Sequence, residues 1–155
     1  MDIKKVTNWF RARNAADLRS NEAAEEMTQL KLMKLLYLAQ GVSLAAYGTP
    51  IFPDPIVAWK LGPAIDSVHH RFAGKREIVG EITDQDRQDY EEVESNPEVS
   101  AVLNAVYETY GGMSASDLVN FTHKQDPWIE TNQSGVIDPD SMKDYFQKNI
   151  LTNEK

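Results

Sequence analysis

The 155-residue sequence contains no cysteine, which excludes a disulfide framework and any zinc site built on thiolates. It has no apolar run of about 20 residues, so no segment is predicted to cross a membrane as a helix. It also has no apolar stretch of signal-peptide length near its start. P-loop, Rossmann and nucleophile-elbow patterns are absent as well. These absences predict a cytoplasmic protein that carries none of the common signatures of nucleotide binding or hydrolysis.

Basic residues are scarce in the second half of the chain. Residues 1–78 carry 11 Lys or Arg and 8 Asp or Glu, a net charge of +3, whereas residues 79–155 carry 5 and 16, a net charge of −11. An acidic field repels phosphate backbones and attracts basic protein surfaces. We therefore expect no direct contact with nucleic acid and a protein partner instead, although an acidic surface also simply keeps a domain soluble.

Apolar residues at helical spacing extend over most of the chain. With 41% hydrophobic residues, a chain of this length can bury a core and is predicted to form one domain. The clearest predicted helix runs from Thr28, a good N-cap residue, to Tyr47, and Gly48 with Pro50 ends it. Residues 14–27 fit a helix or a loop. Further helices are predicted at residues 2–13, 64–72, 84–94, 97–110, 114–123, 127–129 and 139–150.

Prolines interrupt the helical pattern in one place. Four of the seven prolines lie within residues 49–63, where a helix cannot persist. The alternation from Ile56 to Lys60 predicts a short strand. The predicted fold is therefore mainly α, a compact single-domain helical bundle with a short extended or hairpin segment around residues 50–63.

Three short blocks follow one another in the sequence: KLMKLLYLAQG at 31–41, AWKLGP at 58–63 and THKQDPW at 122–128. From its residues alone, the first predicts a buried central helix, in which Gly41 suggests a close neighbouring element. The second predicts a Gly-Pro turn anchored by Trp59, which can also serve as a partner contact. The third places His123 near a helix C-terminus, where the helix dipole favours it.

Together the three blocks resemble the Panacea domain, the SocA-like or GepA-like family found in prophages and toxin–antitoxin operons. The resemblance covers about residues 28–150 and predicts a single Panacea-like domain over residues 1–155. It implies an antitoxin, without cofactor or catalytic residue, that neutralises a cognate toxin protein by direct binding. SocA-like members also act as adaptors that deliver the toxin to a protease. The family-motif positions are Lys34, Leu35, Tyr37, Gln40, Gly41, Thr122, His123, Pro127 and Trp128.

The sequence departs from the usual family pattern at five positions. Aromatic residues are common where Leu38, Val42 and His69 stand. A tyrosine often precedes the Gly-Pro turn where Leu61 stands, and Glu is frequent at Gln125. These differences suggest altered core packing or a different partner. A DNA-binding module of the kind found at the start of some antitoxins is not expected here, nor is self-repression by operator binding.

We predict that the toxin contacts lie on the Gly-Pro turn and on the acidic helix predicted at residues 84–94. Two other functions stay open, together with the oligomeric state. The first is a proteolytic adaptor or prophage regulator that binds a host protein. The second is a small metal-dependent enzyme using Asp66, His69 and His70, which share one helix face, with His123, although no H-E-x-x-H pattern supports it. The predicted contact residues are Trp59, Lys60, Gly62, Pro63, Asp86, Asp89, Glu91 and Glu92.

Overall fold

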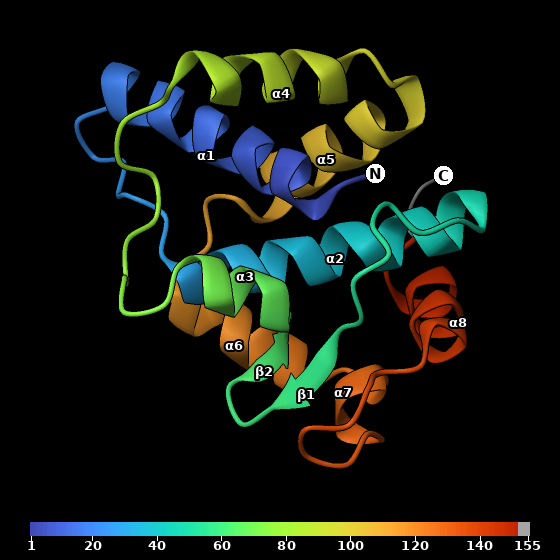
Figure 1. The fold of residues 1–155 in the computed structure, drawn as a ribbon. Coiled ribbons are helices and arrows are strands. Elements are labelled where there is room, and N and C mark those ends of the chain that lie inside the picture. The colour runs from blue at the N-terminus through green and yellow to red at the C-terminus, as the bar shows by residue number, and fades with distance from the viewer. Residues whose placement is uncertain (152–155) are drawn as a thin grey trace.

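The computed structural model describes residues 1–151, and within them the chain forms eight α-helices and one two-stranded antiparallel sheet (Figure 1). The predicted mainly α fold is confirmed. No helix in this part of the chain is long and apolar enough to span a membrane. The elements are α1 (Ile3–Ser20), α2 (Gln29–Tyr47), β1 (Val57–Trp59), β2 (Gly62–Ala64), α3 (Asp66–Arg71), α4 (Asp84–Glu94), α5 (Pro97–Tyr110), α6 (Ala115–His123), α7 (Asp126–Ile129) and α8 (Pro139–Asn149).

Helix α2 is the central element of the fold. The Thr28 side chain accepts a hydrogen bond from the Lys31 backbone N–H, and Gly48 ends the helix in the left-handed conformation, as predicted. Residues 32–41 are all buried, because α5, α6, α8 and the hairpin pack around the helix. An α-helix that is covered on every side forms the core of a domain rather than its surface.

Helices α1, α4 and α5 lie together on one side of α2 (Figure 1). Helix α1 extends to Ser20, so the first part of the undecided segment 14–27 is helical and the remainder is a loop. The Trp9 ring stacks on Tyr90 with 5.7 Å between ring centroids and meets Tyr107 edge-on at 6.1 Å. These aromatic contacts fix α1 between α4 and α5.

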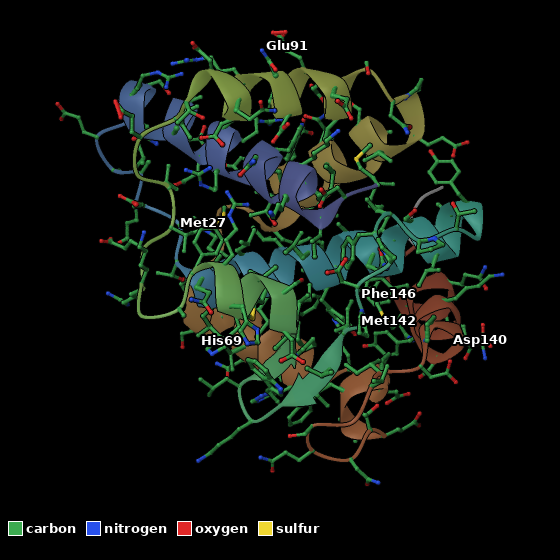
Figure 2. All side chains as sticks on the ribbon, viewed as in Figure 1. Met27, His69, Glu91, Asp140, Met142 and Phe146 are labelled. Carbon is green, nitrogen blue, oxygen red and sulfur yellow. The ribbon has the colours of Figure 1, made fainter. Side chains whose placement is uncertain are left out.

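Helix α8 packs against the C-terminal half of α2 at Gly41, the small residue that predicted a close neighbouring element. A Cβ atom on Gly41 would lie 2.4 Å from Phe146 Cζ, closer than any side chain allows. Phe146 reaches from α8 toward α2 (Figure 2) and also meets the Tyr37 ring edge-on at 5.5 Å. Gly41 is therefore required for the close approach of the two helices.

The predicted extended segment forms the β1–β2 hairpin. Its register pairs Val57 with Ala64, Ala58 with Pro63 and Trp59 with Gly62. Because Ala64 belongs to this pairing, α3 begins at Asp66, two residues later than the predicted helix start at 64. The other edge of β1 is bound by residues 134–137, through hydrogen bonds such as Ala58 N to Gly135 O at 2.9 Å. Strand β1 is thus hydrogen-bonded on both edges.

Candidate functional site

The second and third sequence blocks meet at the end of strand β1. The Trp128 Nε1–H donates a hydrogen bond to the Trp59 carbonyl oxygen at 2.9 Å, and His123 Nε2 lies 3.0 Å from the Lys60 carbonyl oxygen. His123 Nε2 carries the proton in this arrangement, because a carbonyl oxygen only accepts. The His123 and Trp128 rings stack with 4.2 Å between centroids. The third block therefore fixes the backbone just before the hairpin turn.

The first block holds the second strand of the hairpin through Lys34. Its Nζ donates a hydrogen bond to the Pro63 carbonyl oxygen at 2.9 Å, and the residue is only 1% exposed. No carboxylate within residues 1–151 forms an ion pair with it. Burial lowers the pKa of Lys34 to about 8. The lysine is therefore a buried cation that has a hydrogen-bond acceptor but no counter-charge.

Gly62 is the point at which the three blocks touch. Its φ of 110° disfavours any residue with a side chain. A Cβ atom there would lie 2.9 Å from Lys34 Cε and 3.1 Å from Thr122 Oγ1. Glycine is therefore required both for the conformation of the turn and for the space between α2 and α6.

The other family-motif residues build the scaffold beneath the hairpin. The Tyr37 hydroxyl donates to Gln125 Oε1 at 2.7 Å, and burial raises the pKa of this tyrosine far above its ordinary value, so the hydroxyl stays protonated. Gln40 Nε2 donates to the Phe52 carbonyl at 2.8 Å, while its Oε1 accepts from the Ile51 N–H at 2.8 Å. Leu35, Thr122 and Pro127 are buried.

The hairpin borders an open groove of about 580 Å³, together with the start of α2 and the segment after α3. The His69 ring meets the Trp59 ring edge-on at 5.2 Å, and both residues line the groove. Figure 2 labels His69 on α3. Leu61 projects at the turn and is 52% exposed. The groove has an apolar lining that includes Leu30, Met33, Trp59, Leu61 and Ala64, and four cationic side chains, Lys34, Lys60, Lys75 and Arg76.

The basic pair Lys75 and Arg76 is a part of this groove that sequence reasoning missed. The Gln29 backbone N–H donates to the Arg76 carbonyl oxygen at 2.8 Å, and Thr28 forms an isolated β-bridge with Glu77. These backbone bonds place the pair beside the N-terminus of α2. The available signal was the contrast of two adjacent cations with a chain whose net charge is −8.

The predicted acidic contacts on α4 lie far from the hairpin, on the opposite side of α2 (Figures 1 and 2). Glu91 and Glu92 are exposed, and Glu92 Oε2 pairs with Lys5 Nζ at 2.5 Å. Asp86 and Asp89 are each only 6% exposed. The eight predicted contact residues therefore do not form one continuous surface.

The two buried aspartates of α4 have internal partners. Asp86 Oδ1 lies 3.1 Å from Arg11 Nη1, and the Asn8 side-chain amide donates to Asp89 Oδ2 at 2.8 Å. Burial by itself raises the pKa of Asp86, but hydrogen bonds from Thr83 and the charge of Arg11 outweigh burial and hold that pKa below its usual value. Both carboxylates hold α4 against α1, a pairing that local sequence patterns do not indicate.

The four residues of the alternative metal site do not converge. His70 Nδ1 lies 2.9 Å from the Asp66 carbonyl oxygen in its own helix, and His69 Nδ1 lies 3.0 Å from Gln29 Oε1. His123 is held at the hairpin as described above. Across residues 1–151, no three His, Cys, Asp or Glu side chains are grouped so that they could hold a metal ion. The geometry therefore lends no support to a metal-dependent enzyme.

Comparison with known proteins decides the family. Residues 32–129 match the family described as "Antitoxin SocA-like, Panacea domain". The chain belongs to this family. Antitoxin SocA of Caulobacter vibrioides (strain NA1000 / CB15N) is 32% identical over 127 residues, which cover 76% of this chain and 68% of that protein. No solved structure matches. In this Panacea domain the three blocks build one hairpin and its support, which gives the sequence resemblance a structural basis.

Proposed function

We propose that this Panacea-domain protein is an antitoxin that neutralises a cognate toxin protein by binding it directly. Membership of the family and the likeness to Antitoxin SocA support the antitoxin role. The observation that carries direct binding is the hairpin: motif side chains fix its backbone, yet its turn is exposed next to an apolar groove. A rigid turn with aromatic and basic side chains is well suited to act as an interface hot spot.

We assign the toxin contact to the hairpin face, defined as Trp59, Lys60, Leu61 and the adjoining groove. Two large apolar side chains are exposed at or beside this face: Leu61 is 52% exposed and Ile129 is 55% exposed. Trp59 and Lys60 also line a second, smaller hollow of about 250 Å³ beside Ile129. Burying such apolar side chains against a partner stabilises a complex. Gly62 and Pro63 support this face from within, since both are buried.

The exposed acidic residues of α4 have a different part in this proposal. Glu91 and Glu92 lie on the far side of α2, where they add to the negative field of the chain without touching a toxin seated on the hairpin face. Such a field raises the association rate with a basic partner, and salt screens it. Reversing both charges should therefore slow association at low salt and leave the dissociation rate unchanged.

A growth assay tests the proposed function. The protein is co-expressed with the product of the gene adjacent to its own, and the complex is then recovered by affinity purification. Wild type should relieve toxicity and yield a stable complex. Leu61→Asp should lose both, whereas Tyr47→Asp, which changes an exposed apolar residue at the far end of α2, should retain both.

Two outcomes would contradict the proposal. One is failure of wild type to relieve toxicity, and the other is rescue by Leu61→Asp as complete as that by wild type. The amount of toxin in the same cells distinguishes blockage of the toxin from its degradation. A constant amount of toxin indicates that the bound antitoxin blocks its action, whereas a falling amount indicates delivery to a protease.

A further inference from the structure

We propose that the groove beside the hairpin binds a segment of the toxin that is both acidic and apolar, with its apolar side chains against the groove lining and its carboxylates on the basic rim. This inference rests on the proposed antitoxin function, because it takes the toxin as the partner. It goes further by stating the chemistry of the segment that the groove recognises.

The first argument is the charge contrast between the groove and the rest of the molecule. The chain has 24 acidic and 16 basic residues, yet the residues that line the groove include four cations and no Asp or Glu. Because Lys75 and Arg76 are exposed and held next to the start of α2, their charges face an approaching partner. A concave basic surface attracts carboxylates, while the net charge of −8 on the whole chain repels a partner that is acidic throughout.

The second argument is the apolar lining. Met33 and Trp59 offer a polarisable and a flat surface to the groove, and Leu61 covers its edge. A volume of about 580 Å³ lies in the range of sites that enclose several side chains of a ligand. A bare inorganic anion would leave this apolar surface unused, and a nucleic acid backbone would meet the field of a chain with a net charge of −8. A peptide segment with both kinds of side chain matches both features.

The third argument is Lys34, which also lines the groove. Its ammonium group donates one hydrogen bond, to the Pro63 carbonyl, and the residue is 1% exposed. An ammonium has three N–H donors, and a buried charge without a counter-ion is unfavourable. A carboxylate of the toxin segment in the groove would offset this buried charge through space, without contact with the ammonium itself.

A titration with short peptides tests this inference on the full-length protein. The probe is a capped octapeptide that alternates Leu or Phe with Asp or Glu. One control peptide replaces every acidic residue by Lys, and the other replaces every apolar residue by Ser. Binding is followed through the backbone amide resonances of ¹⁵N-labelled protein. The acidic apolar peptide should shift residues 59–62 and 75–76 and bind at least about tenfold more tightly than either control, with added salt weakening it.

Charge reversal in the groove provides the second half of the test. Lys75→Glu/Arg76→Glu should weaken binding of the acidic apolar peptide by about tenfold or more. Lys4→Glu/Arg87→Glu changes the net charge equally at exposed positions of α1 and α4 and should leave binding unchanged. An amide spectrum of each variant shows whether it is folded. Equal binding of the Lys control peptide, shifts outside the groove, or unchanged binding by the groove variant would each overturn the inference.

The growth assay separates this inference from the proposed function. If wild type and Lys75→Glu/Arg76→Glu relieve toxicity equally well, the groove inference fails and the antitoxin function stands. If the peptide binds the groove as expected but wild type neither relieves toxicity nor forms a complex, the antitoxin function fails, and with it the toxin as the source of the segment.

Discussion

Replacing Lys34 by Met tests the energetic cost of the buried ammonium on which the hairpin rests. Lys34 is 1% exposed, and burial lowers its pKa to about 8 from 10.5. Between these two values the unfolded chain binds more protons than the folded protein, so the free energy of unfolding rises with pH across that window. The difference between the two pKa values corresponds to about 3 kcal/mol, a contribution that is missing below pH 8.

Methionine keeps the long, unbranched stem of the lysine but removes its charge and its hydrogen-bond donor. At about pH 7 the variant gains about 3 kcal/mol, because no charge is buried, and loses about 2 kcal/mol with the hydrogen bond to the Pro63 carbonyl. Lys34→Met should therefore be about as stable as wild type, or about 1 kcal/mol more stable. At about pH 10.5 Lys34 is neutral in the folded wild-type protein. Between about pH 7 and about pH 10.5 the free energy of unfolding of wild type should therefore rise by about 3 kcal/mol relative to that of the variant.

Urea unfolding of both proteins at several pH values between about 7 and about 10.5 measures this difference. Burial also raises the pKa of Tyr37 and Tyr107, which affects both proteins alike and cancels in the comparison. Lys124→Met, at an exposed position, is the matched control, because it makes the same substitution without removing a buried ammonium. A stability difference between wild type and Lys34→Met that stays constant with pH would show that burial does not lower the pKa of Lys34.

Three further substitutions test the scaffold. Gly41→Ala should lower the free energy of unfolding by about 2 kcal/mol or more, because the new Cβ atom meets the Phe146 ring. Phe146→Leu should reduce that cost in a double-mutant cycle, and additive effects of the two substitutions would contradict the contact. Tyr37→Phe should cost about 1–2 kcal/mol in chemical denaturation, because Gln125 Oε1 loses its donor, and an unchanged midpoint would argue against that bond. Asp86→Asn should cost about 3 kcal/mol at neutral pH, because the buried Arg11 loses its counter-charge and keeps only its hydrogen bonds to neutral oxygens. Since the folded pKa of Asp86 is depressed, its stabilising effect is lost as pH falls through that pKa, and the difference between Asp86→Asn and wild type should shrink in acid; a difference independent of pH would contradict this.

The parts of the fold that were predictable from the sequence depend on local chemistry. Thr28 and Asn96 cap their helices with their own side chains, and Gly48 adopts the left-handed conformation that few other residues tolerate. Residues 14–20 were undecided because their polarity has a tertiary cause: the Asn14 side chain accepts a hydrogen bond from the Met27 N–H at 2.8 Å and donates one to the Glu25 carbonyl. Such long-range partners leave no mark on the local pattern.

The candidate site was predictable only in part, for the same reason. The AWKLGP block marked the hairpin turn, and its Gly-Pro pair indicated where the chain reverses. The burial of Lys34 depends on contact with Pro63, 29 residues further along the chain, and the groove gathers its four cations from three separate segments: α2, the hairpin turn and the segment after α3. Asp86, Asp89, Glu91 and Glu92 were predicted together as toxin contacts, whereas the helix turns Asp86 and Asp89 inward and leaves Glu91 and Glu92 outside.

The decisive experiment is to co-purify this protein with the product of the adjacent gene, the proposed toxin, and to compare backbone amide hydrogen exchange between the free protein and the complex. We expect a stable complex in which exchange slows at the hairpin turn, at the start of α2 and at residues 75–77, while α4 is unchanged. Failure to form a complex would contradict direct neutralisation. A complex that slows exchange on α4 but not at the hairpin would contradict the assigned contact face.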